Sequence, residues 1–410
     1  MTIALIKRAT MSRNLKRLIG SLTRRSSFVL RPSSFVVLAL FVAACSTSAA
    51  PPTSQSSAVQ SAGGIATAGF ARATAPREFV FPQDHGPHPE YAIEWWYYTG
   101  NLDTAQGRHF GYQLTFFRIG LTPTPTKRPS DFATSNVYMA HFALTDVANQ
   151  KFYAFERFSR GAAGLAGAQA QPFRIWLEDW GAAGAGADGL PMRLQAAQDD
   201  VAIDLTLEGG KPIVLQGDHG LSQKSDEPGN ASYYYSLTRM PTLGTIHVGA
   251  ETNDVSGLSW MDREWSTSAL GPNAVGWDWL AVQLSDGREL AYARLRNAAG
   301  ATIYSDGTLV DQSGNTRRLA PAEVSLAASG EWTSPRSGGR YPSGWRLRVP
   351  AQGLDLTLTP YLADQELPLT TVYWEGAVKI EGSAAGVPIG GNGYVELTGY
   401  GERQGQVRVR

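Results

Sequence analysis

The stretch Val201-Ala-Ile-Asp-Leu-Thr-Leu207 alternates large apolar side chains with small or polar ones over its whole length. Because successive side chains of a strand point to opposite faces of a sheet, this alternation predicts a strand with one buried face. Turn signals such as Asp286-Gly287 and Asn392-Gly393 separate further runs of this kind. These runs cover residues 112–117, 137–144, 279–284, 345–349 and 354–359. Short strands with frequent turns predict an all-β fold of sandwiches or barrels, and 410 residues suffice for two β-domains in tandem.

The N-terminal segment has the composition of an export signal. Basic residues continue to Arg31 without an acidic residue, and the apolar stretch 35–44 that follows is shorter than the roughly 20 residues of a membrane-spanning helix. Val42-Ala-Ala-Cys45 resembles a bacterial lipobox, and Cys45 is the only cysteine of the chain. We therefore expect a lipoprotein signal peptide over 1–45 and lipidation of Cys45; the alternative is an ordinary signal peptide. Lipidation would anchor the protein to a bacterial membrane of the cell envelope, facing the periplasm.

The rest of the chain divides by composition into a linker and two domains. Residues 46–76 are rich in Ser, Ala, Gly and Thr and predict a flexible tether. We place an N-terminal β-barrel domain at 77–270 and a C-terminal one at 271–410. Without its basic leader the chain is acidic, which argues against a nucleic-acid partner. The single cysteine excludes a disulfide framework and a cysteine-based zinc cluster, and no P-loop or dinucleotide fingerprint is present, so we expect no cofactor.

Aromatic residues gather beside carboxylates at 94–98, 260–265, 277–279 and 373–375. On a strand, Trp260 and Asp262 share a face. An aspartate on an aromatic-lined face is desolvated and keeps its proton, so it can protonate an alkene, and ring faces can stabilise the resulting cation. The alternatives are that the rings only fill barrel interiors and that Asp262 pairs with Arg263 or Arg239.

Two groups of histidines need separate interpretations. Asp84-His85-Gly-Pro-His88 has a spacing compatible with two metal ligands, but no third ligand is adjacent, so we expect an irregular loop and no metal. His141 shares a strand face with Met139. It is either a hydrogen-bonded interior histidine or a pocket residue that polarises a ligand.

Several motifs of the chain point together to a known family. They are Asp84-His-Gly-Pro-His-Pro-Glu-Tyr-Ala-Ile-Glu-Trp-Trp-Tyr-Tyr-Thr-Gly100, Met139-Ala-His-Phe-Ala-Leu-Thr-Asp146, Tyr234-Tyr-Ser-Leu-Thr-Arg239, Val255-Ser-Gly-Leu-Ser-Trp-Met-Asp-Arg-Glu-Trp265, Gly276-Trp-Asp-Trp279, Tyr373-Trp-Glu-Gly376 and Gly393-Tyr-Val-Glu-Leu-Thr-Gly-Tyr400. This ordered set resembles the AttH-like family of lipocalin-like proteins, which includes the carotenoid 1,2-hydratases (hydroxyneurosporene synthases). The resemblance covers residues 77–400 and implies two tandem lipocalin-like (calycin) β-barrels with an apolar ligand pocket.

The hydratases in this family carry a His-x-Trp pair followed, about two dozen residues later, by a Tyr-x-Asp pair whose Asp is the acid. Here Trp260-x-Asp262 matches the second pair and Tyr233-x-Tyr235 the first, so the acid is kept and three residues differ. The resemblance implies Asp262 as acid, surrounded by Trp260, Tyr233 and Tyr235. We expect ligand contacts from Trp95, Trp96, His141, Trp265, Trp277, Trp279 and Trp374.

Three functions fit these observations. The first is a membrane-anchored lipocalin-like protein that binds a hydrophobic small molecule, such as a lipid or an isoprenoid-like compound. The second is a hydro-lyase related to carotenoid 1,2-hydratase, in which Asp262 protonates an alkene. The third is an accessory subunit whose partner is an envelope transport system.

Overall fold

The structure is a computed structural model that describes residues 67–125, 129–268, 270–271 and 273–401. The expected signal peptide, Cys45 and residues 46–66 of the expected tether lie outside the described residues. Of the tether range only 67–76 is described, and there Phe70 and Ala73 are buried against the folded body. Within the described ranges, no helix has the length and hydropathy that crossing a membrane requires.

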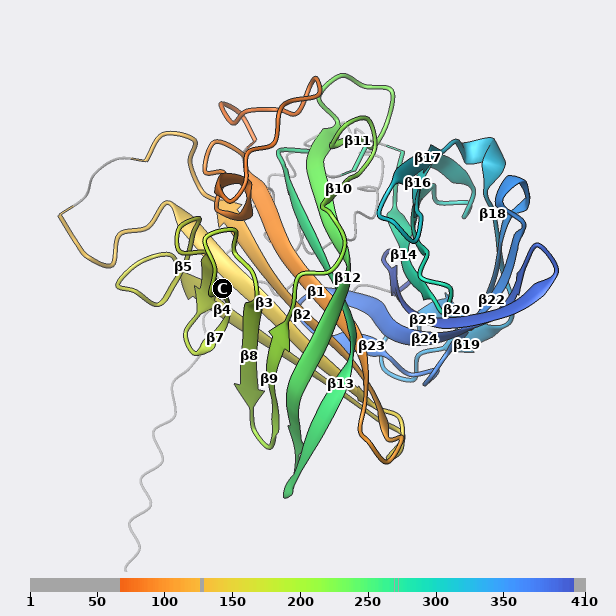
Figure 1. Ribbon diagram of the computed structural model, residues 1–410. Coiled ribbons are helices and arrows are strands. Elements are labelled where there is room, and N and C mark those ends of the chain that lie inside the picture. Colours follow the sequence, from red (N-terminus) through yellow and green to blue (C-terminus); the bar gives the residue numbers. More distant parts are fainter. Residues whose placement is uncertain (1–66, 126–128, 269, 272, 402–410) are drawn as a thin grey trace, which may run out of the picture. The chain divides into compact units, whose positions relative to one another are not determined.

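The N-terminal half forms one large antiparallel sheet with the strand order β4-β3-β2-β1-β13-β12-β9-β8-β7-β6-β5, while β10 and β11 pair with β12 (Figure 1). Its strands are β1 (Ile93–Asp103), β2 (His109–Gly120), β3 (Asn136–Asp146), β4 (Lys151–Arg160), β5 (Ala166–Gln169), β6 (Arg174–Leu177), β7 (Trp180–Gly184), β8 (Met192–Gln198), β9 (Val201–Leu207), β10 (Val214–Leu215), β11 (Leu221–Gln223), β12 (Ala231–Val248) and β13 (Glu251–Ser266).

The C-terminal half forms a second antiparallel sheet, which curls into a nearly closed barrel with the order β17-β16-β15-β14-β25-β24-β22-β21-β18 (Figure 1). Its strands are β14 (Gly276–Leu284), β15 (Glu289–Arg296), β16 (Thr302–Val310), β17 (Thr316–Leu319), β18 (Ser325–Ala328), β21 (Trp345–Val349), β22 (Leu354–Pro360), β23 (Glu366–Pro368), β24 (Val372–Ala384) and β25 (Val387–Leu397). A small sheet joins β19 (Glu331–Thr333) to β20 (Arg340–Pro342), and the described helices are the 3-10 turns η1 (Gln83–His85), η2 (Pro321–Glu323) and η3 (Pro350–Gln352). The predicted all-β fold is confirmed.

Strand alternation builds the core inside each sheet. In β9, the apolar residues Val201, Ile203 and Leu205 are buried, while the residues between them are half-buried. Each fully buried side chain of this size stabilises the fold by about 1.5–3 kcal/mol. The same alternation in β21 and β22 fills the second barrel.

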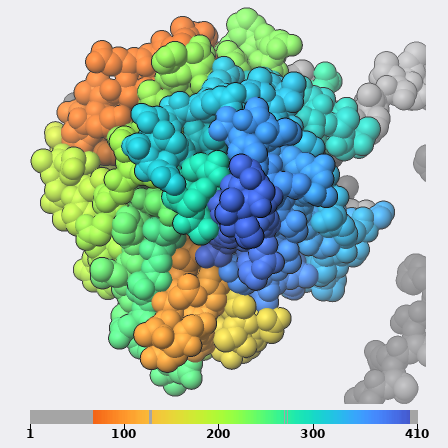
Figure 2. Space-filling model, turned by 45° about the vertical axis from the view of Figure 1, so that its right-hand side comes forward, coloured from red at the N-terminus to blue at the C-terminus, as the bar shows by residue number. Residues whose placement is uncertain are grey.

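Strands β1, β2 and β13 differ because they are buried on both faces over much of their length. Their outer face packs against the second sheet, so cyan and blue residues abut orange and green ones in Figure 2. The two sheets approach closely, because a Cβ added to Gly111 would collide with Cβ of Ala377. Across this contact Asn101 donates to the carbonyl of Gly393 and Thr145 to the side chain of Gln365. The two sheets therefore share a buried interface.

Candidate active site

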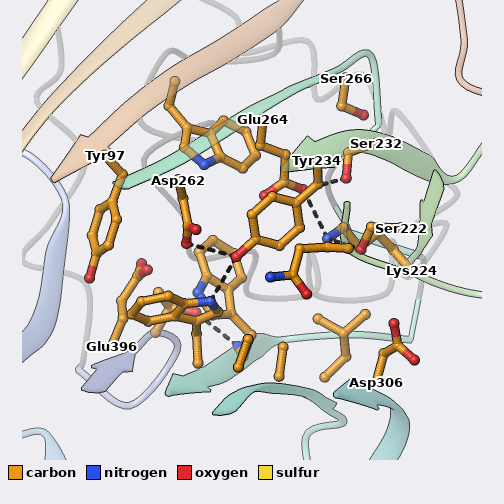
Figure 3. A pocket seen from close by; sticks show the side chains of 18 of the residues that line it. Tyr97, Ser222, Lys224, Ser232, Tyr234, Asp262, Glu264, Ser266, Asp306 and Glu396 are labelled. Carbon is orange, nitrogen blue, oxygen red and sulfur yellow. Dashed lines mark hydrogen bonds and ion pairs between the residues drawn. The ribbon is translucent and has the colours of Figure 1, made fainter. Parts of the chain in front are cut away.

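A pocket of about 130 Å³ lies in this interface, between the outer face of the first sheet and the second sheet (Figure 3). A cavity of roughly 150 Å³ holds a benzene molecule, so one ring or a branched alkenyl group fits. Its principal walls are Trp95, Tyr97, Tyr234 and Asp262 from the first sheet and Trp277, Trp279, Tyr373, Glu375 and Glu396 from the second.

Strand register decides which side chains reach the pocket. Asp262 on β13 lies opposite Ser236 on β12 and opposite Tyr97 on β1. Because side chains alternate, Tyr234 shares the face of Ser236 and Asp262. Tyr233 and Tyr235 flank Tyr234 in sequence and therefore face the other side of the sheet.

Asp262 is buried and accepts three hydrogen bonds. Its Oδ1 accepts from the Ser236 hydroxyl and from the Trp260 indole at 2.7 Å, and its Oδ2 accepts from the Tyr234 hydroxyl at 2.7 Å. Burial raises the pKa of Asp262 to about 7, although these three donors favour the charged form. The carboxyl group thus holds a proton that it can release near neutral pH.

Neither arginine that could have neutralised Asp262 reaches it. The Arg263 side chain lies on the opposite face of β13 and pairs with Glu94, while Arg239 pairs with Glu289. The alternative of a structural ion pair at Asp262 is therefore wrong.

The second sheet brings two further carboxyl groups to the pocket. Glu375 on β24 lies directly opposite Glu396 on β25, and the Tyr97 hydroxyl donates to Glu375 at 2.7 Å. Burial raises the pKa of Glu396 to about 8, and burial together with the nearby Glu396 raises that of Glu375 well above its ordinary value. By contrast, Glu264 on the pocket wall is paired with Lys224 at 2.9 Å.

Four of the sequence-predicted residues line the pocket: Asp262, Trp95, Trp277 and Trp279. Trp260 lies behind the wall, where its indole bonds to Asp262. Trp279 donates to the Tyr234 hydroxyl at 3.1 Å and meets the Tyr97 ring edge-on, with centroids 5.1 Å apart. Of Tyr233, Tyr234 and Tyr235, only Tyr234 therefore lines this pocket.

The remaining predicted residues lie elsewhere. Tyr233, Tyr235 and Trp265 form a separate cluster with Phe79, so the expectation that these tyrosines surround a cation beside Asp262 does not hold. The cause is a β-bulge between Leu237 and Met240, which changes the face that residues N-terminal to it present. Trp96 and Trp374 fill the cores of the first and second sheets, and His141 lies behind Tyr373.

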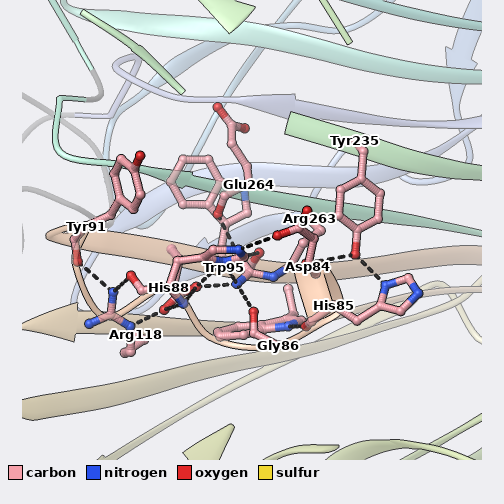
Figure 4. Close-up of polar contacts among 12 residues, drawn as sticks. Asp84, His85, Gly86, His88, Tyr91, Trp95, Arg118, Tyr235, Arg263 and Glu264 are labelled. Atoms are coloured by element: carbon pink, nitrogen blue, oxygen red, sulfur yellow. Dashed lines mark hydrogen bonds and ion pairs between the residues drawn. The ribbon is translucent and has the colours of Figure 1, made fainter. Parts of the chain in front are cut away.

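On the opposite face of β13, a second polar cluster is built from ion pairs and hydrogen bonds (Figure 4). Glu94 accepts from Arg118 and Arg263, and these guanidinium groups hold its pKa well below the usual range although burial opposes them. Arg263 also bonds to the carbonyl of Gly86 and so fixes the loop before β1. His88 bonds to Asp84 at 2.9 Å. Among the described residues, no group of His, Cys, Asp and Glu is placed to hold a metal ion.

Comparisons with known proteins agree with this architecture. A crystal structure of a protein described as AttH from Nitrosomonas europaea superposes with a TM-score of 0.73 at 36% identity, covering 81% of this chain and 100% of that one. Kievitone hydratase from Nectria haematococca shares the fold, with a TM-score of 0.61 at 16% identity over 80% and 96% of the two chains. Among curated proteins, no sequence matches significantly. The family model described as AttH-like matches residues 72–400, and the chain belongs to the AttH-like family.

Proposed function

We propose that this protein is a hydratase-type enzyme that adds water to a carbon–carbon double bond, or removes it in reverse, with Asp262 as general acid. One observation carries the proposal: a buried carboxyl group without a cationic partner lines an aromatic pocket in the described structure. Because its pKa is raised to about 7, this group is still partly protonated at neutral pH and can transfer its proton to a weak base. The shared fold with a protein that is a kievitone hydratase supports the reaction class.

The hydrogen bonds suggest how the proton reaches the substrate. When Asp262 is protonated, its hydroxyl can donate to the Tyr234 oxygen, which already accepts from Trp279. A tyrosine hydroxyl has two acceptor positions and one proton, so that proton then points to another acceptor. Tyr234 would donate its hydroxyl proton to the alkene. The rings of Trp279 and Tyr97 would then stabilise the carbocation that forms.

The pocket size restricts the substrate class. About 130 Å³ holds the double-bond end of an apolar, isoprenoid-like molecule, and the rest of that molecule would extend out of the pocket. Lipidation of Cys45, which we retain as a proposal, would place the pocket near a membrane where such molecules concentrate. The aromatic walls also suit a carrier that binds the same molecules without changing them.

The test separates the enzyme from the carrier. Purified protein is incubated with a panel of prenylated phenols and terpenoid alkenes in ¹⁸O-labelled water, and products are analysed by mass spectrometry. We expect label in an alcohol product with the wild type and with the surface control Asp204→Asn, and none with Asp262→Asn. Equal product from Asp262→Asn would refute the role of this acid. Binding of an unchanged compound by all three proteins would establish the carrier.

A further inference from the structure

His141 connects two other side chains across the sheet interface. Its Nδ1 lies 2.8 Å from the Tyr373 hydroxyl on β24, and its Nε2 lies 3.1 Å from Oε1 of Glu156 on β4. The imidazole is fully buried, and the Phe117 ring of β2 packs on it at 5.3 Å between centroids. Three strands thus contribute one continuous line of polar groups.

The direction of these hydrogen bonds follows from Glu156. Burial alone would raise the pKa of Glu156, but hydrogen bonds from His141 and Thr370 outweigh it, and the pKa lies below its ordinary value. An ionised carboxylate only accepts, so Nε2 of His141 carries the proton. In the neutral imidazole Nδ1 is then an acceptor and receives the hydrogen bond of Tyr373.

The line joins the pocket to the surface. Tyr373 lines the pocket, whereas the Glu156 side chain is 13% exposed. Burial, together with Glu375 and Glu396, raises the pKa of Tyr373 well above its ordinary value, so this hydroxyl stays neutral. The other groups near it are Gln113 at 3.5 Å and the hydroxyl of Tyr394. A neutral hydroxyl with a histidine acceptor can pass a proton without ionising first.

We propose that Tyr373, His141 and Glu156 form a base relay that removes a proton from a group bound in the pocket. In the hydration proposed above, on which this role rests, that group is the attacking water. Its oxygen bonds to the carbocation, its O–H bond breaks, and the proton passes to the Tyr373 oxygen. The Tyr373 proton passes to Nδ1 of His141, and the Nε2 proton passes to Glu156 and then to solvent. Asp262 passed its proton to Tyr234 when Tyr234 protonated the alkene, and it regains a proton from solvent, so no net proton is consumed.

The relay can be tested without any natural substrate. A small arylsulfonyl fluoride reacts with a base-activated tyrosine: the O–S bond forms, fluoride leaves and the tyrosine proton goes to the histidine. We expect peptide mass spectrometry to locate the label on Tyr373 in the wild type. His141→Gln and Glu156→Gln should each slow labelling at least about tenfold, since general-base assistance is worth roughly 10²–10⁴-fold. The exposed His219→Gln is the control and should label at the wild-type rate.

Two variants keep this inference apart from the proposed function. Asp262→Asn should abolish hydration but leave labelling of Tyr373 intact. Tyr373→Phe should lower kcat about 10²–10⁴-fold with little change in KM. Labelling without hydration in the wild type would remove the proposed reaction and keep the relay. Unchanged labelling in both Glu156→Gln and His141→Gln, or full hydration by Tyr373→Phe, would overturn the relay.

Discussion

The stability of the variant Asp262→Asn, relative to the wild type, should increase as the pH rises. The pKa of Asp262 is about 7 in the folded protein and about 3.8 when exposed. The folded state therefore binds this proton more tightly than the unfolded chain between these two values. The stability that the raised pKa of Asp262 contributes to the folded wild type is fully present below pH 4. It is lost as the pH rises through 7, because the folded state must then bury an ionised group.

The magnitude follows from the pKa difference. About three pKa units at 1.36 kcal/mol each correspond to about 4 kcal/mol. Asparagine has nearly the same shape, can accept from Ser236 and Trp260, and never ionises. We therefore expect the free energy of unfolding of Asp262→Asn, relative to wild type, to rise by about 4 kcal/mol between pH 4 and pH 8.

Urea unfolding at one-unit pH intervals measures this difference, and titrations common to both proteins cancel. Asp204→Asn is a control of opposite sign, because its bond to Arg193 lowers the pKa of Asp204. That variant should lose less than about 1 kcal/mol above pH 4. Parallel stability curves for wild type and Asp262→Asn would show that Asp262 ionises normally, and the general-acid argument would fail.

Two other variants probe the surroundings of this acid. Tyr234→Phe removes one donor to the ionised form, worth about 1.5–3 kcal/mol, so the pKa of Asp262 should rise by about 1–2 units; infrared titration of its carboxyl band measures the shift, and an unchanged midpoint would exclude this bond. Arg263→Met leaves Glu94 with one of its two guanidinium partners and should cost about 3–5 kcal/mol of unfolding free energy. The exposed Arg193→Met should cost less than about 1 kcal/mol, and equal losses would contradict the structural role of Arg263.

Local sequence pattern was sufficient for the strands and for part of the site. Alternation in 201–207 predicts the buried face of β9, and the shared face of Trp260 and Asp262 predicts that they act together. Both inferences use only neighbours within one strand. There the side-chain period is fixed by backbone geometry.

Choosing between Tyr234 and its neighbours requires information from two strands. Counted from the β12–β13 turn without interruption, Asp262 would lie opposite Leu237, and Tyr233 and Tyr235 would share its face. The bulge between Leu237 and Met240 inserts one residue into β12, so Asp262 lies opposite Ser236 instead. One extra residue moves every side chain beyond it to the other face. Neither glycine nor proline lies within this bulge to mark it in the sequence.

The residues of the second sheet were harder still to predict. Glu396 and Tyr373 line the same pocket as Asp262 only because two sheets pack face to face. Nothing in the spacing of residues on β13 and β25 encodes that contact. The sequence indicates His141 as either an interior or a pocket residue. The structure agrees with the first alternative, because His141 is buried, bonded to Tyr373 and Glu156, and lies one side chain behind the pocket.

The two faces of β13 differ in how their carboxyl groups are neutralised: Asp262 on the pocket side has no cationic partner among the described residues, whereas Glu94 is ion-paired on the opposite side. Arg263 follows Asp262 directly and points to the other face, where Glu94 is paired with two guanidinium groups. A fold selected only for stability would neutralise or replace the buried Asp262, Glu375 and Glu396, since each ionised group costs folding free energy there. In the part of the chain that the structure describes, Asp262, Glu375 and Glu396 have no cationic partner at the pocket, whereas Glu94 on the opposite face is ion-paired, and carboxyl groups without such a partner are what proton-transfer chemistry requires. The stability that Asp262→Asn should gain is thus the expected counterpart of the activity that it should lose.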